Sequence, residues 1–232
     1  MSDSSLPYPP PPPPLVVLND GVLGRKIPGV HKTLFWVSIA ALLASIFILI
    51  AEINNYQFMS DLKNEAFAST GEMRIRADEV DSFIASAYGF SVLVYVVLFT
   101  VFLVWLNKMT KNLNDSGYKT NKGSKWVIGS FFIPIANYFL VFGSIKDLLT
   151  GLGKAIPTLS NNHQKTIKTW WILFSISSVL VRVSGIELSA DADIDQYLNL
   201  AGFSVCVALL NVVALGFGVK AFKQLRDNTK IV

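Results

Sequence analysis

Two long stretches without a single charged side chain constrain this chain more than any other feature. Residues 40–51 and 83–107 contain no Asp, Glu, Lys or Arg. The hydrocarbon core of a bilayer accepts about 20 consecutive apolar residues as a helix and penalises ionised side chains. Charged residues make up only 16% of the 232-residue chain, against about 25% in a soluble domain. The sequence therefore predicts an integral membrane protein.

Four stretches have the length and hydrophobicity of complete membrane spans. They cover residues 33–53, 83–106, 170–188 and 197–219. Trp105 ends the second span and Trp170 and Trp171 open the third, as expected of aromatic rings at the level of the lipid headgroups. The expected fold class is all-α, an integral membrane bundle of four transmembrane helices.

A fifth hydrophobic segment, residues 126–145, is expected to be broken or re-entrant. Pro134 stands in its middle and Asn137 follows three residues later. Proline removes a helix hydrogen bond and clashes with the preceding turn. Broken membrane helices expose backbone groups that can bind ions or substrates. Asn137 is equally suited to bond a carbonyl that Pro134 leaves free, so a ligand site and a structural role are both open.

Apolar residues recur at helical spacing directly after this segment. Lys146, Asp147 and Lys154 lie off the apolar face, and Pro157 follows it. This pattern predicts a short amphipathic helix at the membrane interface, ended by the proline. The apolar face consists of Ile145, Leu148, Leu149, Leu152 and Ile156.

The distribution of the 20 Lys and Arg residues predicts the topology. Four crossings place the basic residues of the tail, of loops 107–125 and 146–169 and of residues 220–232 on one side. The positive-inside rule assigns that side to the cytoplasm. A complete fifth crossing would invert the last two helices and place their basic flanks outside. Both termini are therefore expected to be cytoplasmic, with residues 220–232 as a basic C-terminus.

The N-terminal tail, residues 1–32, contains an unbroken run from Pro9 to Pro14. Such a run cannot form a helix or a sheet and favours extended polyproline II structure. The tail is expected to be disordered and proline-rich. It is interpreted either as a stiff spacer or as a ligand for an aromatic-lined groove on a protein partner.

The residues around the broken segment resemble a known family. Residues 126–137 have the form W-x-x-G-x-x-F-x-P-x-A-N, with Trp105-Leu106, Asn112 and Gly117 upstream and Trp170-Trp171 downstream. Over roughly residues 35–220 the chain resembles the bacterial membrane proteins catalogued as domain of unknown function 4328. Ser130 departs from that pattern, which has an aromatic residue there. The resemblance implies a multi-span protein of the bacterial plasma (inner) membrane and carries over no catalytic residue.

Arg182 is the most costly residue in the predicted spans. A central arginine costs about 2.5–3.5 kcal/mol on insertion scales, so its side chain is expected to face the bundle interior or to extend towards the outer surface. Glu52, near the outer end of the first span, and Glu187, five residues after Arg182, are its candidate partners. A structural ion pair and a gate for an ion or substrate are both consistent with this pattern.

Other chemistry has little support in the sequence. Asp191, Asp193 and Asp195 imitate the start of a calcium loop, but Gln196 and Gly202 stand where its glycine and glutamate belong. His31 and His163 are the only histidines and both lie in predicted cytoplasmic flanks. No metal site, cofactor or catalytic residue is predicted, and the dispersed basic residues do not indicate nucleic-acid binding.

The leading functional hypothesis is a non-enzymatic scaffold or partner-binding protein of the membrane. The alternative is a small transporter or channel with a polar site around Arg182, Glu52 and Asn137. Transport would require these three side chains to line one connected cavity. Assembly with copies of itself or with other proteins is open.

Overall fold

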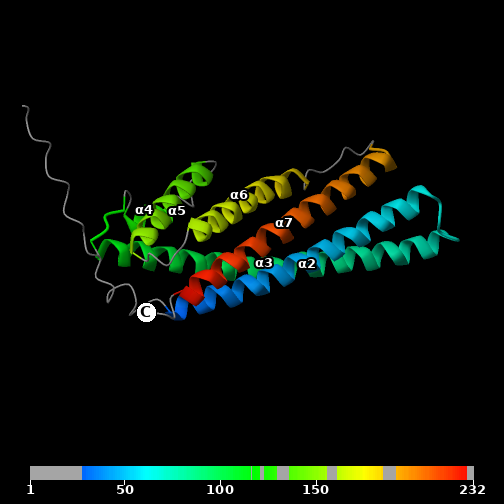
Figure 1. Cartoon of the computed structure of the whole chain (residues 1–232). Coiled ribbons are helices and arrows are strands. Elements are labelled where there is room, and N and C mark those ends of the chain that lie inside the picture. The colour runs from blue at the N-terminus through cyan, green and yellow to red at the C-terminus, as the bar shows by residue number, and fades with distance from the viewer. Residues whose placement is uncertain are drawn as a thin grey trace, which may run out of the picture.

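The computed structural model describes residues 28–115, 117–120, 123–129, 136–155, 161–184 and 192–228. Its helices, in chain order, are α2 (Pro28–Lys63), α3 (Thr70–Asp115), α4 (Ser124–Gly129), α5 (Ala136–Ala155), α6 (Asn161–Ser184) and α7 (Ile194–Asn228). Figure 1 shows α2, α3, α6 and α7 as long rods running in roughly the same direction. The run from Pro9 to Pro14 in the predicted tail lies outside the described residues.

Four of the described helices, α2, α3, α6 and α7, are long and apolar enough to cross a membrane. They contain the four predicted spans apart from the last residues of the third, so the predicted all-α membrane bundle is confirmed. The helices are longer than the bilayer needs. At 1.5 Å per residue, the 46 residues of α3 extend over about 69 Å, against about 30 Å of hydrocarbon. Both ends of α3 therefore project beyond the hydrophobic layer.

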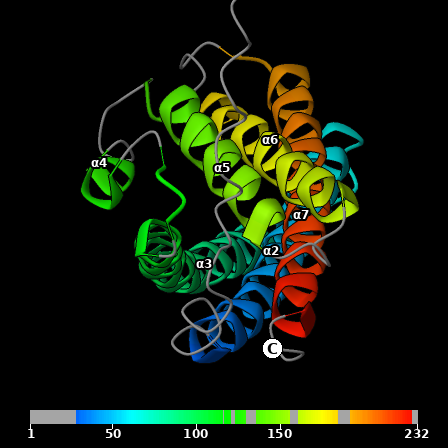
Figure 2. The same ribbon diagram turned by 60° about the vertical axis from the view of Figure 1, so that its left-hand side comes forward.

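The four long helices form an open arrangement. α2 packs against α3 and α7, and α7 packs against α6. In Figure 2 the four helices follow one another around an arc in the order α3, α2, α7 and α6. The shorter helix α5 contacts both α3 and α6. It therefore bridges the two outer members at one end of the bundle.

An aromatic cluster forms the centre of the packing. Trp105, Trp170 and Trp171 retain only 1%, 4% and 7% of their surface exposed. The rings of Trp170 and Phe222 meet edge to face with centroids 4.9 Å apart, and Phe102 stacks on Trp105 at 5.6 Å. Such pairs contribute about 0.5–1.5 kcal/mol beyond the area they bury. The cluster joins α3, α6 and α7, so these tryptophans pack against neighbouring helices inside the bundle.

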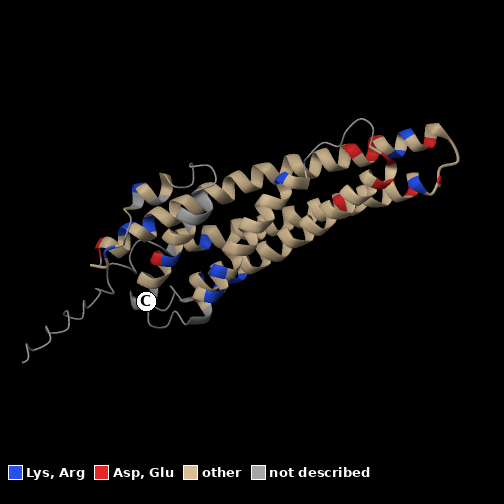
Figure 3. Cartoon of the chain, turned by 90° about the horizontal axis from the view of Figure 1, so that it is seen from above, with Lys and Arg blue, Asp and Glu red and all other residues tan. Residues whose placement is uncertain are grey.

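Charge separates along the bundle. Figure 3 shows most Lys and Arg at one end and most Asp and Glu at the other. We call the first the basic end; it holds the start of α2 and the end of α7, where the Arg226 guanidinium lies 4.1 Å from the centre of the Phe35 ring. The other, the acidic end, holds the end of α2 and the starts of α3 and α7.

The region of the predicted broken segment contains two separate helices, α4 and α5. Residues 130–135, with Pro134, lie outside the described residues, and so does the side chain of Asn137. The second half of α5 carries the predicted amphipathic pattern. Ile145, Leu148 and Leu149 are buried, whereas Lys146 is exposed. Tyr118 packs against α5, and its hydroxyl lies 3.4 Å from Asp147 Oδ1 of that helix.

Candidate functional site

A cavity of about 460 Å³ lies in the opening between α3 and α6. Its walls are largely apolar and aromatic, and α7 contributes to them through Asn211. We call it the α3–α6 cavity. Its lining residues are Tyr95, Leu98, Phe99, Phe102, Trp170, Trp171, Phe174, Ser175, Ser177, Ser178, Val181, Arg182 and Asn211. Pockets with predominantly apolar walls and a few polar groups are typical ligand sites.

Polar groups are placed at defined points of this cavity. The side-chain amide of Asn211 donates a hydrogen bond of 2.9 Å to the hydroxyl of Tyr95, which links α7 to α3. Ser178 donates to the carbonyl of Phe174 within α6. Asn211, Tyr95 and Ser178 therefore have hydrogen-bond partners within the protein. Among the described residues that line the cavity, Arg182 is the one with a charged side chain.

Arg182 lies in the last turn of α6, towards the acidic end. Its side chain is exposed, and among the described residues no ion pair includes it. Its candidate partner Glu187 lies outside the described residues. The other candidate, Glu52, lines a different cavity and bonds to a different residue. The described part of the chain therefore does not bring Arg182 and Glu52 together.

Glu52 is buried between helices towards the acidic end, with 5% of its surface exposed. The hydroxyl of Tyr88 on α3 donates a hydrogen bond of 2.5 Å to Glu52 Oε1 on α2. A second cavity of about 480 Å³ adjoins this pair, and we call it the Glu52 cavity. Its lining residues are Glu52, Asn55, Met59, Ile84, Tyr88, Val181, Ser184, Tyr197, Leu200, Ala201 and Ser204.

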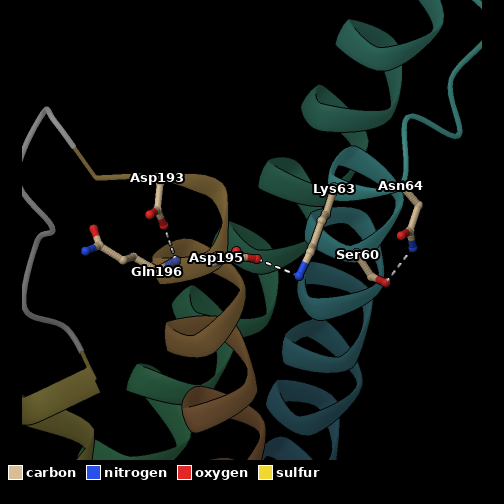
Figure 4. Close-up of polar contacts among 6 residues, drawn as sticks. All are labelled: Ser60, Lys63, Asn64, Asp193, Asp195 and Gln196. Carbon is tan, nitrogen blue, oxygen red and sulfur yellow. Dashed lines mark hydrogen bonds and ion pairs between the residues drawn. The ribbon is translucent and has the colours of Figure 1, made fainter.

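Polar contacts join α2 to α7 beyond the Glu52 cavity (Figure 4). Lys63 Nζ at the end of α2 lies 2.6 Å from Asp195 Oδ1 at the start of α7. This hydrogen bond and the charge of Asp195 raise the pKa of Lys63 above its ordinary value of 10.5. Asp193 Oδ1 accepts a hydrogen bond from the backbone N–H of Gln196 and caps α7. Two of the three aspartates that imitate a calcium loop thus have structural contacts.

Two hydrogen bonds between helices could not be identified from the sequence: the one from Tyr88 to Glu52 and the one from Asn211 to Tyr95. Tyr88, Tyr95 and Asn211 lie inside apolar spans, where a tyrosine is read as part of the hydrophobic pattern. Asn211 was the available signal, because an amide inside a membrane helix needs a hydrogen-bonding partner. Its partner lies 116 residues away in the chain and only the packing of α3 with α7 identifies it.

The family described as Domain of unknown function (DUF4328) matches residues 68–227. The chain belongs to this family. The match begins just before α3 and ends within α7, so it excludes α2 and is shorter at its start than the resemblance over residues 35–220. No curated protein and no solved structure matches the chain.

The boundary of the match divides the two cavities of this DUF4328 protein. Every residue of the α3–α6 cavity lies within residues 68–227. The Glu52 cavity takes Glu52, Asn55 and Met59 from α2, outside the match. The α3–α6 cavity is therefore built entirely from the family region, and the buried carboxylate is supplied by the helix that precedes it.

Proposed function

We propose that this DUF4328 protein is a non-enzymatic binding protein of the membrane, and that its α3–α6 cavity holds one membrane lipid with an anionic headgroup. The observation that carries the proposal is the Arg182 guanidinium beside a largely apolar, aromatic-lined cavity, with no ion-pair partner among the described residues. An arginine at membrane depth is costly unless an anion compensates its charge. A phosphate group suits the planar, multidentate guanidinium.

The size and position of the cavity support a lipid over a protein segment. A transmembrane helix is about 10–12 Å across and would fill far more than the 460 Å³ available between α3 and α6. An acyl chain is narrow enough to enter a cavity of this size. It is also apolar, and so are the walls formed by Phe99, Phe102 and Phe174. The long helices are themselves surrounded by lipid, so the ligand needs no aqueous route.

Transport has less support than binding. A connected polar path would require Arg182 and Glu52 to line one cavity, whereas the two side chains line separate cavities that share only Val181 among their described lining residues.

The charge separation of Figure 3 supports a cytoplasmic basic end under the positive-inside rule. We extend the proposal to a bacterial plasma membrane location, with the Pro9–Pro14 tail available to a cytoplasmic protein partner.

The test is lipid retention. Purified protein would be equilibrated with equal amounts of phosphatidylglycerol and phosphatidylcholine in detergent, and bound lipids counted by native mass spectrometry. We expect wild-type protein to retain phosphatidylglycerol roughly tenfold better, which corresponds to about 1.4 kcal/mol.

The variant Arg182→Gln should lose this preference. Arg74→Gln serves as the matched control, because Arg74 is exposed at the acidic end and lines neither cavity. A preference that persists in Arg182→Gln, or that falls equally in Arg74→Gln, would contradict the proposal.

A further inference from the structure

The Glu52 cavity contains a buried carboxylate that has no cationic partner among the residues that the structure describes. Glu52 is 5% exposed and its hydrogen bond comes from the neutral hydroxyl of Tyr88. None of the described residues that line the cavity is Lys, Arg or His. A buried charge is strongly disfavoured unless an opposite charge and hydrogen bonds compensate it. The described lining of this cavity therefore supplies a carboxylate and no positive charge.

We infer that the Glu52 cavity binds a small organic ammonium ion, with the Glu52 carboxylate as counter-ion and the rings of Tyr88 and Tyr197 as its aromatic walls. Aromatic rings attract ammonium groups through their negative faces, and quaternary ammonium ligands are recognised in this way. Both tyrosines line the cavity and stand on different helices, α3 and α7.

The shape and donor set favour an organic cation over a metal ion. Calcium takes six to eight oxygen ligands at 2.3–2.6 Å, whereas the described residues that line this cavity of about 480 Å³ include one carboxylate. That volume accommodates an ammonium group with its alkyl substituents. Asn55, Ser184 and Ser204 also line the cavity and supply polar groups for a substituent such as a hydroxyl.

The surroundings favour approach of a cation from the acidic end. Glu52 lies in the second half of α2 and Tyr88 in the first half of α3, towards this end, and Figure 3 shows most Asp and Glu residues there. The capping residue Asp193 is one of them, four residues before Tyr197. Clustered charge of one sign raises the local concentration of opposite charge and accelerates association.

The test compares choline with its neutral isostere 3,3-dimethylbutan-1-ol on the full-length protein in detergent. Binding would be measured by isothermal titration calorimetry, and sodium chloride would be titrated separately at constant ionic strength. We expect choline to bind at least tenfold more tightly than the neutral alcohol, and sodium to produce no saturable signal. Equal binding of choline and the alcohol would overturn the inference, as would saturable binding of sodium in place of choline.

Variants assign the binding to this site. Glu52→Gln should weaken choline binding at least tenfold, whereas Asp61→Asn, which changes an exposed carboxylate of the same helix, should leave it unchanged. Tyr197→Leu keeps the carboxylate and removes one aromatic wall, so it tests the site even if Glu52→Gln does not fold; we expect at least a threefold loss. Unchanged affinity in Tyr197→Leu, or an equal loss in Asp61→Asn, would overturn the inference.

Arg182→Gln separates this inference from the proposed function. Arg182 lines the α3–α6 cavity and not the Glu52 cavity. The substitution should remove the lipid preference and leave choline affinity within twofold of wild type. A loss of choline binding of the same size as in Glu52→Gln would overturn the assignment of the ammonium ion to a separate site.

Discussion

Trp170 on α6 lies directly against Gly218 on α7. A Cβ atom added to Gly218 would lie 2.8 Å from Trp170 Nε1, closer than side chains normally approach. Gly218 therefore sets the distance between the two helices at the aromatic cluster. Ala214 and Gly218 lie four residues apart, a spacing of small residues that is typical of closely packed membrane helices. The neighbouring Gly216 has nothing within 4 Å of the same position.

Gly218→Ala should lower stability because Trp170 has to move within a packed aromatic cluster. Overpacking of this kind typically costs about 1–3 kcal/mol, and we expect a corresponding fall in the thermal unfolding midpoint in detergent. Gly216→Ala is the matched control and should be neutral or stabilising by up to about 1 kcal/mol, since alanine favours helix. Equal midpoints for the two variants would contradict this role of Gly218.

Gly151→Ala should displace Tyr118 from α5. The added Cβ would lie 2.7 Å from two atoms of the Tyr118 ring. We expect a loss of about 1–3 kcal/mol in thermal unfolding, recovered in part when Tyr118→Ala is added to make room. Gly143→Ala, at an open position of the same helix, should be tolerated. If the double variant is no more stable than Gly151→Ala, the ring is not the obstacle.

Tyr88→Phe should destabilise the protein by leaving the buried Glu52 carboxylate without its hydroxyl donor. The loss of one partner of a buried polar pair costs about 1–3 kcal/mol. Thermal unfolding in detergent would measure the change. Tyr197→Phe is the control, because its ring lines the same cavity and no described hydrogen bond to Glu52 comes from its hydroxyl. A larger effect in the control would contradict the role of the Tyr88 hydroxyl.

The Lys63–Asp195 pair should stabilise the acidic end only while Lys63 is protonated. The pKa of Lys63 is raised in the folded protein above 10.5. The contribution is therefore complete below the unfolded pKa and is lost as pH rises through the folded one. The unfolding midpoints of wild type and Lys63→Gln should differ at pH 8 in low salt and converge as the pH rises through the raised pKa of Lys63. Because both side chains are exposed, added salt should shrink the difference.

The observed ends of the helices show what a local hydropathy pattern predicts and what it does not. Hydropathy located the spans but not the extensions beyond them. Phe58 and Leu62 lie beyond the predicted end of the first span at residue 53, and both belong to the uninterrupted helix α2. Outside the bilayer, helix continues until a residue leaves helical geometry, and here that residue is Glu65 with a φ of 52°. A glutamate is an uncommon choice there, so the sequence carried no clear stop signal.

The sequence by itself determined the number of spans, the all-α class, the family and the separation of charge, because these depend on composition within short windows and on the energy of transfer into lipid. Tertiary structure decided which face of each span points inwards. Lipid tails are as apolar as leucine, so hydrophobicity does not distinguish a lipid-facing side chain from a core-facing one. That is why Trp105 and Trp170 proved to be buried, and why Glu52 meets Tyr88 while Arg182 lies in a different cavity.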